Sequence, residues 1–238
     1  MLHNYERHGY GRNGFTLIEL VVVIVILGIL AAIAAPRFVS LRSDAIKATL
    51  RNMEGNIREA NTMVYAKAII NNANTNYSNN VPGSEAWSET CKNNNCVNVG
   101  GDNWVYIKYA YVDRNSVAFI LDADIEGVKT KTKQHEITGE TIQIPDRGGT
   151  NTKGTLNYLC SNAGNALCES HEFCQCRVSE DNIGGIKRDT QYIVPRGFKY
   201  NQKDESNPDN RCYFKYSSAE YINGVVYPPA YTLETGGC

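Results

Sequence analysis

Four cysteines and a histidine form the densest group of reactive side chains. Cys160, Cys168, Cys174 and Cys176 lie within 17 residues, with His171 among them. Thiolates and an imidazole suit a tetrahedral zinc site, but this spacing matches no common zinc signature, and we favour disulfides over a metal. Cys174 and Cys176 are too close in sequence to pair comfortably. Crossed links such as Cys160 with Cys174 or Cys176 are expected, and the sequence does not choose between them.

The other four cysteines suggest two further cross-links. Cys91 and Cys96 flank Lys-Asn-Asn-Asn and are expected to close a small turn. A bond between Cys212 and Cys238 would close a loop of 27 residues. Such a loop is worth roughly 3–4 kcal/mol on loop-entropy arithmetic. Because all eight cysteines follow residue 90, we expect the domain after that point to be exported to an oxidising compartment.

A single carboxylate in an apolar segment is the second chemical feature. From Phe15 to Ala35 the chain runs 21 residues with Glu19 as its one charged side chain. At a rise of about 1.5 Å per residue this reaches about 30 Å, which predicts a membrane-spanning helix. Cleavage after Gly14 would keep the segment on the mature chain and create an α-amino group on Phe15, one helical turn from Glu19. That amine can pair with Glu19 of its own chain or of a neighbouring copy.

The sequence Gly14-Phe15-Thr16-Leu17-Ile18-Glu19, followed by the apolar run, resembles the processing site of type IV pilins and of the pseudopilins of type II secretion. The resemblance implies cleavage after Gly14 by a prepilin peptidase and N-methylation of Phe15. It also implies a pilin fold and packing of the N-terminal helices into a filament core.

A looser similarity points to one subgroup of pilins. The sequences Ala35-Pro36-Arg37-Phe38 and Cys212-Tyr213-Phe214-Lys215-Tyr216 are similar to those of the mannose-sensitive haemagglutinin pilins. The resemblance implies that residues 212–238 form a disulfide-bounded region exposed on the filament surface.

The N-terminal third is expected to contain a leader and one long helix. Residues 1–14 read as a leader that is removed, and residues 15–36 as the transmembrane helix that also forms the filament core. Gly28 and Pro36 mark the place where this helix should kink or loosen. From 37 to 70 an amphipathic helix follows. Its apolar stripe repeats at steps of three and four residues and is expected to pack on a sheet; its members are Ile46, Leu50, Met53, Ile57, Ala60 and Val64.

The remaining residues, 71–238, are expected to form loops and an antiparallel sheet, which makes the fold class α+β. Strands are predicted at Trp104–Val112 and Ser116–Leu121, joined by a turn at residues 113–115. Residues 71–103 and 147–210 are predicted to be mostly loop. Three alternating lysines are expected on one side of a further strand, more simply a solvated edge than an anionic-ligand patch; they are Lys129, Lys131 and Lys133.

Composition and motifs argue against several function classes. The formal net charge is −1, so no basic excess suggests a nucleic-acid partner. The four histidines are scattered, and no serine or cysteine nucleophile stands in a recognisable catalytic frame, so we expect no enzymatic activity, no cofactor and no metal.

Three structural roles follow from these observations. The first is a pilin subunit that leaves the inner membrane and polymerises into a surface filament used in attachment and in motility. The second is a pseudopilin of type II secretion, and the third is a minor pilin acting as a tip adhesin. The receptor or surface that would be bound is not readable from the sequence.

Overall fold

The computed structural model describes residues 16–71, 96–121, 123–125, 129–134, 139–146, 167–169, 171–199, 206–207 and 210–238. The chain divides into two compact units, residues 1–45 and residues 46–238, and each is treated by itself. Gly14, Phe15, Cys91 and Cys160, together with most of the expected loops, lie outside the described residues.

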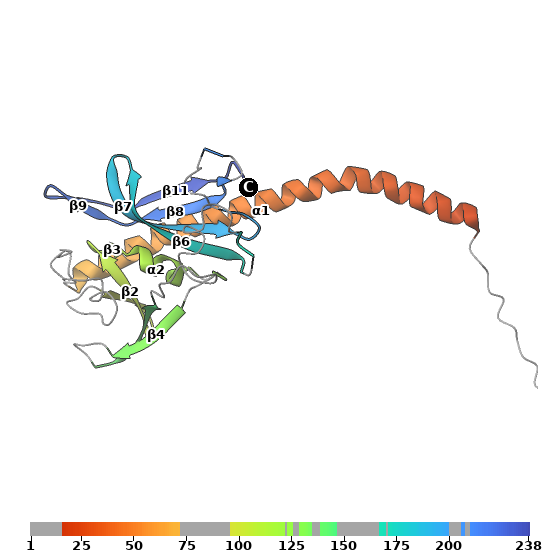
Figure 1. Cartoon of the computed structure of the whole chain (residues 1–238). Helices are drawn as coiled ribbons and strands as arrows, with labels where there is room; N and C mark the ends of the chain where they lie inside the picture. Colours follow the sequence, from red (N-terminus) through yellow and green to blue (C-terminus); the bar gives the residue numbers. More distant parts are fainter. Residues whose placement is uncertain are drawn as a thin grey trace, which may run out of the picture. The chain divides into compact units, whose positions relative to one another are not determined.

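The long helix predicted for the N-terminal third is confirmed. Helix α1 runs over Leu17–Ile70 as 54 residues (Figure 1). It contains both Gly28 and Pro36 and is helical through both positions, so loosening between them stays a prediction. The part of α1 that follows Ala45 belongs to the second unit.

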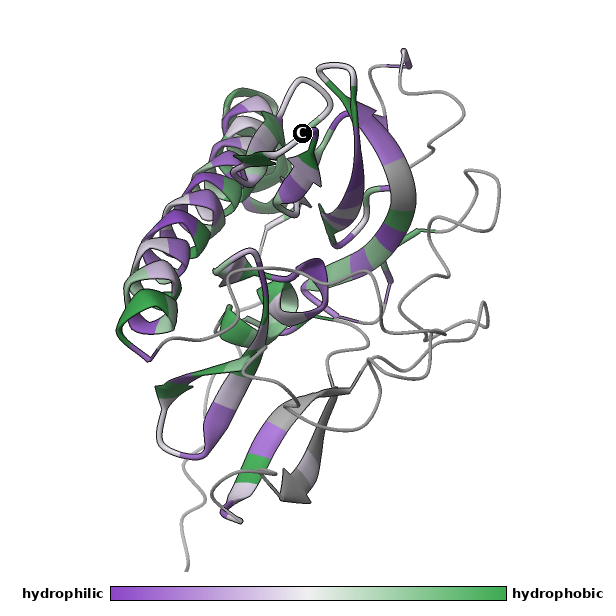
Figure 2. Cartoon of the chain, turned by 90° about the vertical axis from the view of Figure 1, so that its left-hand side faces the viewer, coloured by the Kyte–Doolittle hydropathy of each residue, from purple (hydrophilic) through white to green (hydrophobic). Residues whose placement is uncertain are grey.

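The apolar stripe on the second half of α1 is the base of the hydrophobic core. Leu50, Ile57 and Val64 are fully buried, Met53 nearly so, and Ile46 is partly buried. Figure 2 shows hydrophobic and hydrophilic residues interleaved along this helix, as an amphipathic segment requires. The stripe shares one core cluster with residues of α2 and of several strands; these include Val105, Val112, Val117, Phe214 and Tyr216.

The described residues form three sheets beside the helix. The first has the order β1-β2-β5-β4, with β3 paired to β2; the second is β10-β9; the third is β11-β8-β7-β6. Among the strands of the described residues all pairings are antiparallel except the parallel pair Asn103↔Gln143 between β2 and β5, and an isolated parallel bridge joins Ile125 to Phe173. The strands are β1 Cys96–Gly100, β2 Asn103–Lys108, β3 Tyr111–Val112, β4 Lys129–Gln134, β5 Thr141–Asp146, β6 Phe173–Ile183, β7 Ile186–Pro195, β8 Tyr213–Ser217, β9 Glu220–Ile222, β10 Val225–Tyr227 and β11 Ala230–Glu234.

The predicted strand at Ser116–Leu121 is wrong. That segment is helix α2, Arg114–Ile120. Its N-cap is Asp113, whose side chain accepts a hydrogen bond from the backbone N–H of Asn115. The predicted strand at Trp104–Val112 is confirmed only in part. Tyr109 and Ala110, within it, have φ of 53° and 69° and turn the chain between β2 and β3. The predicted hairpin to Ser116–Leu121 is therefore wrong, and a different, shorter hairpin joins β2 to β3 within the first predicted strand.

Two predicted loop regions contain strands. Residues 96–100 form β1, within the stretch predicted as loop up to residue 103. The long hairpin of β6 and β7 lies within residues 147–210, and its turn is Gly184-Gly185, with φ of 60° and 85°. The strand at Lys129–Gln134 is confirmed, and it pairs with β5.

Candidate assembly site and C-terminal region

The first turn of α1 holds Glu19 in a defined set of contacts. The backbone N–H and the hydroxyl of Thr16 both donate to Glu19 Oε2, each at 2.8 Å. In return the backbone N–H of Glu19 donates to Thr16 Oγ1 at 3.3 Å. This reciprocal arrangement is a capping box, with Thr16 as N-cap and Glu19 three residues later. The helix therefore starts one residue after Thr16, and Phe15 precedes the cap.

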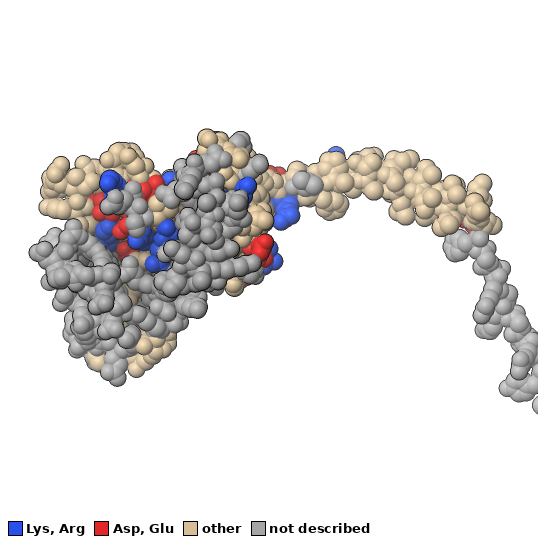
Figure 3. Space-filling model, viewed as in Figure 1, with Lys and Arg blue, Asp and Glu red and all other residues tan. Residues whose placement is uncertain are grey.

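The apolar residues that follow are exposed. The exposed large hydrophobic side chains from Leu17 to Leu41 each have 42–81% of their surface accessible to solvent. In Figure 3 this part of the helix has very few charged atoms. Among the described residues α1 is the one helix long and apolar enough to cross a membrane, and its apolar window is not buried within the protein. An exposed apolar surface of this extent is typical of segments that contact lipid or another protein.

The C-terminal region is closed by a disulfide between Cys212 and Cys238, with their Cα atoms 5.0 Å apart. Cys212 immediately precedes β8, and Cys238 follows β11, which pairs with β8 through five residue pairs. The bond therefore brackets four strands, β8 to β11.

A hairpin of exposed apolar residues lies within this bracket. Strands β9 and β10 are joined by Asn223 and Gly224, whose φ values of 52° and 88° are those of a tight hairpin turn. Tyr221, Val225 and Val226 expose 41–53% of their surfaces. Aromatic and β-branched residues exposed in this way are typical of contact surfaces.

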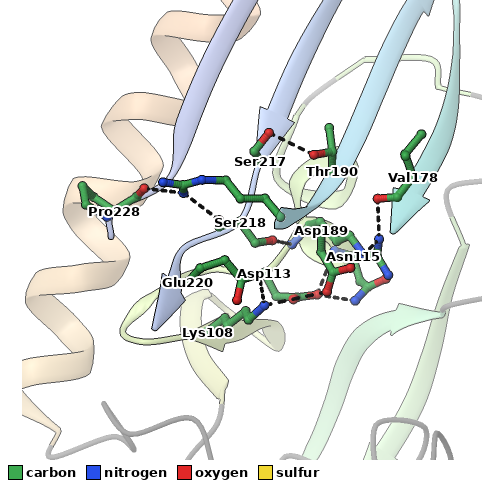
Figure 4. A network of polar contacts seen from close by, with 12 residues as sticks. Lys108, Asp113, Asn115, Val178, Asp189, Thr190, Ser217, Ser218, Glu220 and Pro228 are labelled. Atoms are coloured by element: carbon green, nitrogen blue, oxygen red, sulfur yellow. Dashed lines mark hydrogen bonds and ion pairs between the residues drawn. The ribbon is translucent and has the colours of Figure 1, made fainter. Parts of the chain in front are cut away.

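The base of the hairpin is held by buried charges. Lys108, at the end of β2, is nearly buried and forms an ion pair with Glu220 of β9 (Figure 4). Tyr109 stacks on Tyr221 with ring centroids 5.9 Å apart. Burial raises the pKa of the Tyr109 hydroxyl, with a further contribution from the nearby Glu220 carboxylate.

The same polar network joins α2 to β7 (Figure 4). Arg114 Nη1 lies 3.1 Å from Asp189 Oδ1 and donates to the carbonyl of Val178 at 2.9 Å. Arg188 donates to the carbonyls of Ser218 and Pro228, and burial lowers its guanidinium pKa. These contacts fix the segments on either side of the exposed hairpin.

The central cysteine cluster contains disulfides. Cys168 is bonded to Cys174, which overturns the expected Cys160–Cys174 alternative. Only five residues lie between this pair, and the chain between them bends at residues 171–172 before β6 begins. Cys96 and Cys176 are also disulfide-bonded, and their partners lie outside the described residues. With Cys168, Cys174 and Cys176 oxidised, none of these three described cysteines offers a thiolate to a zinc ion.

His171 contacts a carboxylate. Its Nδ1 lies 2.7 Å from Asp124 Oδ1, and Asp124 Oδ2 accepts from the backbone N–H of Glu172 at 3.1 Å. The hydrogen bond from His171, followed by that from Glu172, lowers the pKa of the Asp124 carboxyl. This pair links the Cys168–Cys174 loop to the segment after α2.

Comparison with known proteins points to the same N-terminal segment. Residues 10–35 match the prokaryotic N-terminal methylation motif. This chain carries the N-terminal segment of the type IV pilin and pseudopilin family. It is 48% identical over 56 residues to the type IV narrow pilus major component PilA5 of Thermus thermophilus, covering 24% of this chain and 48% of that protein. It is 44% identical over 43 residues to the type II secretion system core protein G of Pectobacterium carotovorum subsp. carotovorum, covering 18% of this chain and 28% of that protein.

The pilin and pseudopilin similarity is partial in length. The chain spans about half or less of each of these two relatives. No solved structure is significantly similar to the chain. Neither relative is a haemagglutinin pilin, and that closer resemblance stays a prediction.

The sequence analysis missed two features that lie near its expected site residues. Thr16 was not singled out, although Thr-x-x-Glu ahead of an apolar run is a known helix-start signal. The β9–β10 hairpin was not resolved either, although Asn-Gly between two short apolar runs is a strong hairpin signal.

Proposed function

We propose that this protein is a structural subunit of a type IV pilus, inserted in the inner membrane and then polymerised into an extracellular filament that serves attachment. The observation that carries this proposal is the exposed apolar first half of α1, which continues into the amphipathic helix of a disulfide-linked α+β unit. Identical helices packed together in a filament bury that surface as the membrane did before assembly. The match to the N-terminal methylation motif supports the same role.

The proposal includes the steps that precede assembly. A prepilin peptidase cleaves after Gly14, Phe15 is N-methylated, and the pilus machinery adds the subunit to a homopolymer. The Glu19 carboxylate pairs with the new amine and so avoids standing alone in an apolar helix bundle. A role in adhesion, and in motility, rests on the same reasoning, and the function is structural rather than catalytic.

A pseudopilin of type II secretion is the second candidate. The similarity to a core protein G favours it specifically. Eight cysteines and an exposed apolar hairpin favour the surface filament, because both suit a domain that works outside the cell.

Intact-mass analysis of filaments sheared from the producing cell tests the proposal. We expect the main protein to begin at methylated Phe15 and to be lighter by eight hydrogen atoms than the fully reduced chain. A processed chain that stays in the inner membrane and is missing from the sheared fraction would move the assignment to a pseudopilin or a minor pilin.

The Glu19→Ala variant tests the pairing step. We expect it to insert in the membrane in normal amount and to give few or no filaments. A normal filament yield from this variant would contradict the neutralisation of the amine by Glu19.

A further inference from the structure

The outer edge of strand β11 has no hydrogen-bonding partner among the described residues. β11 is the last strand of its sheet and pairs with β8 along residues 230–234 (Figure 1). Beyond β8, its hydrogen bonds and ion pairs in this part of the chain come from two side chains. The Tyr231 hydroxyl accepts from Asn61, and the Glu234 carboxylate lies 3.2 Å from Arg211 Nη2. The backbone N–H and C=O groups on the outer side of β11 therefore form a template for a further strand.

The other sheet edges in the described ranges carry features that discourage such pairing. Strand β4 has lysine at every second position, and β6 is interrupted by a bulge between Val178 and Asp181. β1 has an irregular register between Asn98 and Gly100, and Lys67 of α1 donates to the Asn98 carbonyl. β3, β9 and β10 are only two or three residues long. Lysines, bulges and short strands are the common protections of exposed edges.

β11 has none of these protections. Its sequence is Ala-Tyr-Thr-Leu-Glu, without lysine or proline, and its register with β8 is continuous over five residue pairs. Its one charged side chain, Glu234, is paired with Arg211 of the same chain, so charge repulsion along this edge is small. Among the edges of the described sheets, β11 is therefore the one most suited to pair with another strand.

A second copy of β11 fits this edge in an antiparallel register centred on Thr232. Thr232 then lies opposite Thr232 of the second copy, Tyr231 lies opposite Leu233, and Ala230 lies opposite Glu234. No two like charges face each other in this register, and β-branched and aromatic side chains occupy its centre. The strand is thus complementary to itself.

We infer that β11 is a contact between two copies of this chain, in which their edge strands pair across a twofold axis and join two sheets into one. The inference rests on the proposed function and adds a second kind of subunit contact. Copies within one helical filament all point the same way, so a twofold pairing joins copies of different filaments. A pairing of five residues is weak alone, but a filament repeats it many times along its length. The result is lateral association of filaments.

Cross-linking tests the register. Thr232→Cys places two thiols opposite each other with Cα atoms about 4.5–5.5 Å apart, which is within reach of a disulfide. Ala230→Cys is the matched control, because it lies on the same face of the same strand and its two copies would be about 14 Å apart along the strand. We expect an oxidant to give dimers in sheared filaments of Thr232→Cys and none in those of Ala230→Cys. Intact mass checks that both variants keep the native disulfides.

A charge placed at the centre of the pairing tests lateral association. In Thr232→Lys two lysines face each other, and the bundled fraction seen by electron microscopy should fall about tenfold or more, because the repulsion recurs at each contact along a filament. Added salt should restore part of the bundling. Thr232→Val keeps a β-branched side chain and should bundle like the wild type. The yield of filaments should stay normal in both variants.

Three results would overturn the inference: wild-type filaments that do not associate laterally, wild-type bundling by Thr232→Lys, or equal cross-linking of Thr232→Cys and Ala230→Cys. A cross-link from Thr232→Cys to a different protein would give the edge another occupant and also count against it. The two cysteine variants are also compared as full-length chains in detergent, where no filament is needed. If the chain forms no filaments, the proposed function fails, while selective dimerisation of Thr232→Cys would still show the strand pairing.

Discussion

Replacing Asn61 should destabilise the second unit more than replacing any other asparagine of α1. Asn61 is a residue of α1 and is 3% exposed, and its side chain contacts residues of two sheets. Its Oδ1 accepts from the backbone N–H of Val112 at 2.9 Å, and its Nδ2 donates to the Tyr231 hydroxyl at 2.9 Å. The buried Tyr216 hydroxyl also lies within reach and donates to the Val112 carbonyl.

The cost of Asn61→Ala follows from which partners are left unpaired. Val112 is fully buried, so its N–H loses a partner that water cannot replace, at about 1–3 kcal/mol. Tyr231 is only partly buried and recovers a hydrogen bond from solvent, and Tyr216 keeps its bond to Val112. Adding a small cavity term gives about 2–4 kcal/mol, or a fall in unfolding midpoint of about 4–16 °C for a unit of this size.

Thermal unfolding of the full-length chain in detergent, followed by near-ultraviolet circular dichroism, measures this effect. Thr62→Ala is the matched control, because Thr62 is the exposed neighbour on the same helix, and its midpoint should move by less than about 2 °C. A similarly small shift in Asn61→Ala would refute the reasoning, since it would mean that the Val112 N–H has another partner or is open to water.

Three further predictions concern the ends and turns of the second unit. Cys212→Ser and Cys238→Ser should each lower stability by about 3.5 kcal/mol and speed proteolysis; unchanged resistance to protease in both would contradict the bond. Gly224→Ala should destabilise by about 1 kcal/mol because its φ is 88°, whereas Gly55→Ala, in the exposed helix, should stabilise by about 0.5–1 kcal/mol; equal shifts in unfolding midpoint would contradict this. The lowered pKa of Asp124 means that its contribution is complete above its ordinary value of 3.8 and is lost as pH falls below it. The difference in unfolding midpoint between wild type and Asp124→Asn should therefore shrink from pH 6 to pH 3, and a constant difference would count against the His171 contact.

Strong periodic signals were readable from the sequence. The stripe of Leu50, Met53, Ile57 and Val64 is buried as predicted, because three- and four-residue steps place these side chains on one helix face. Thr16 and Glu19 were also within reach of sequence reasoning, since the capping box is local. Such a motif can be recognised without knowing which other elements pack against the helix.

The errors arose where tertiary contacts or caps decide the structure. Ser116–Leu121 has the β-branched and aromatic residues of a strand, yet the Asp113 cap starts a helix there. The β6–β7 hairpin was hidden because its buried positions include Gln175, Arg188 and Gln191, which break the alternation of apolar and polar residues. Gln191 Nε2 donates to Gln175 Oε1 across the two strands, a pairing that sequence alone does not reveal.

The Cys212–Cys238 bond has a mechanical consequence if the folded chain is put under tension. Strand β11 is at the edge of its sheet and carries the C-terminus, so without a cross-link a pull on that end would unzip it from β8 one hydrogen bond at a time. The bond ties the free end of β11 to the residue that precedes β8. A force applied at the C-terminus is therefore passed to Cys212 through a covalent link, and peeling from that end is closed as a route of unfolding.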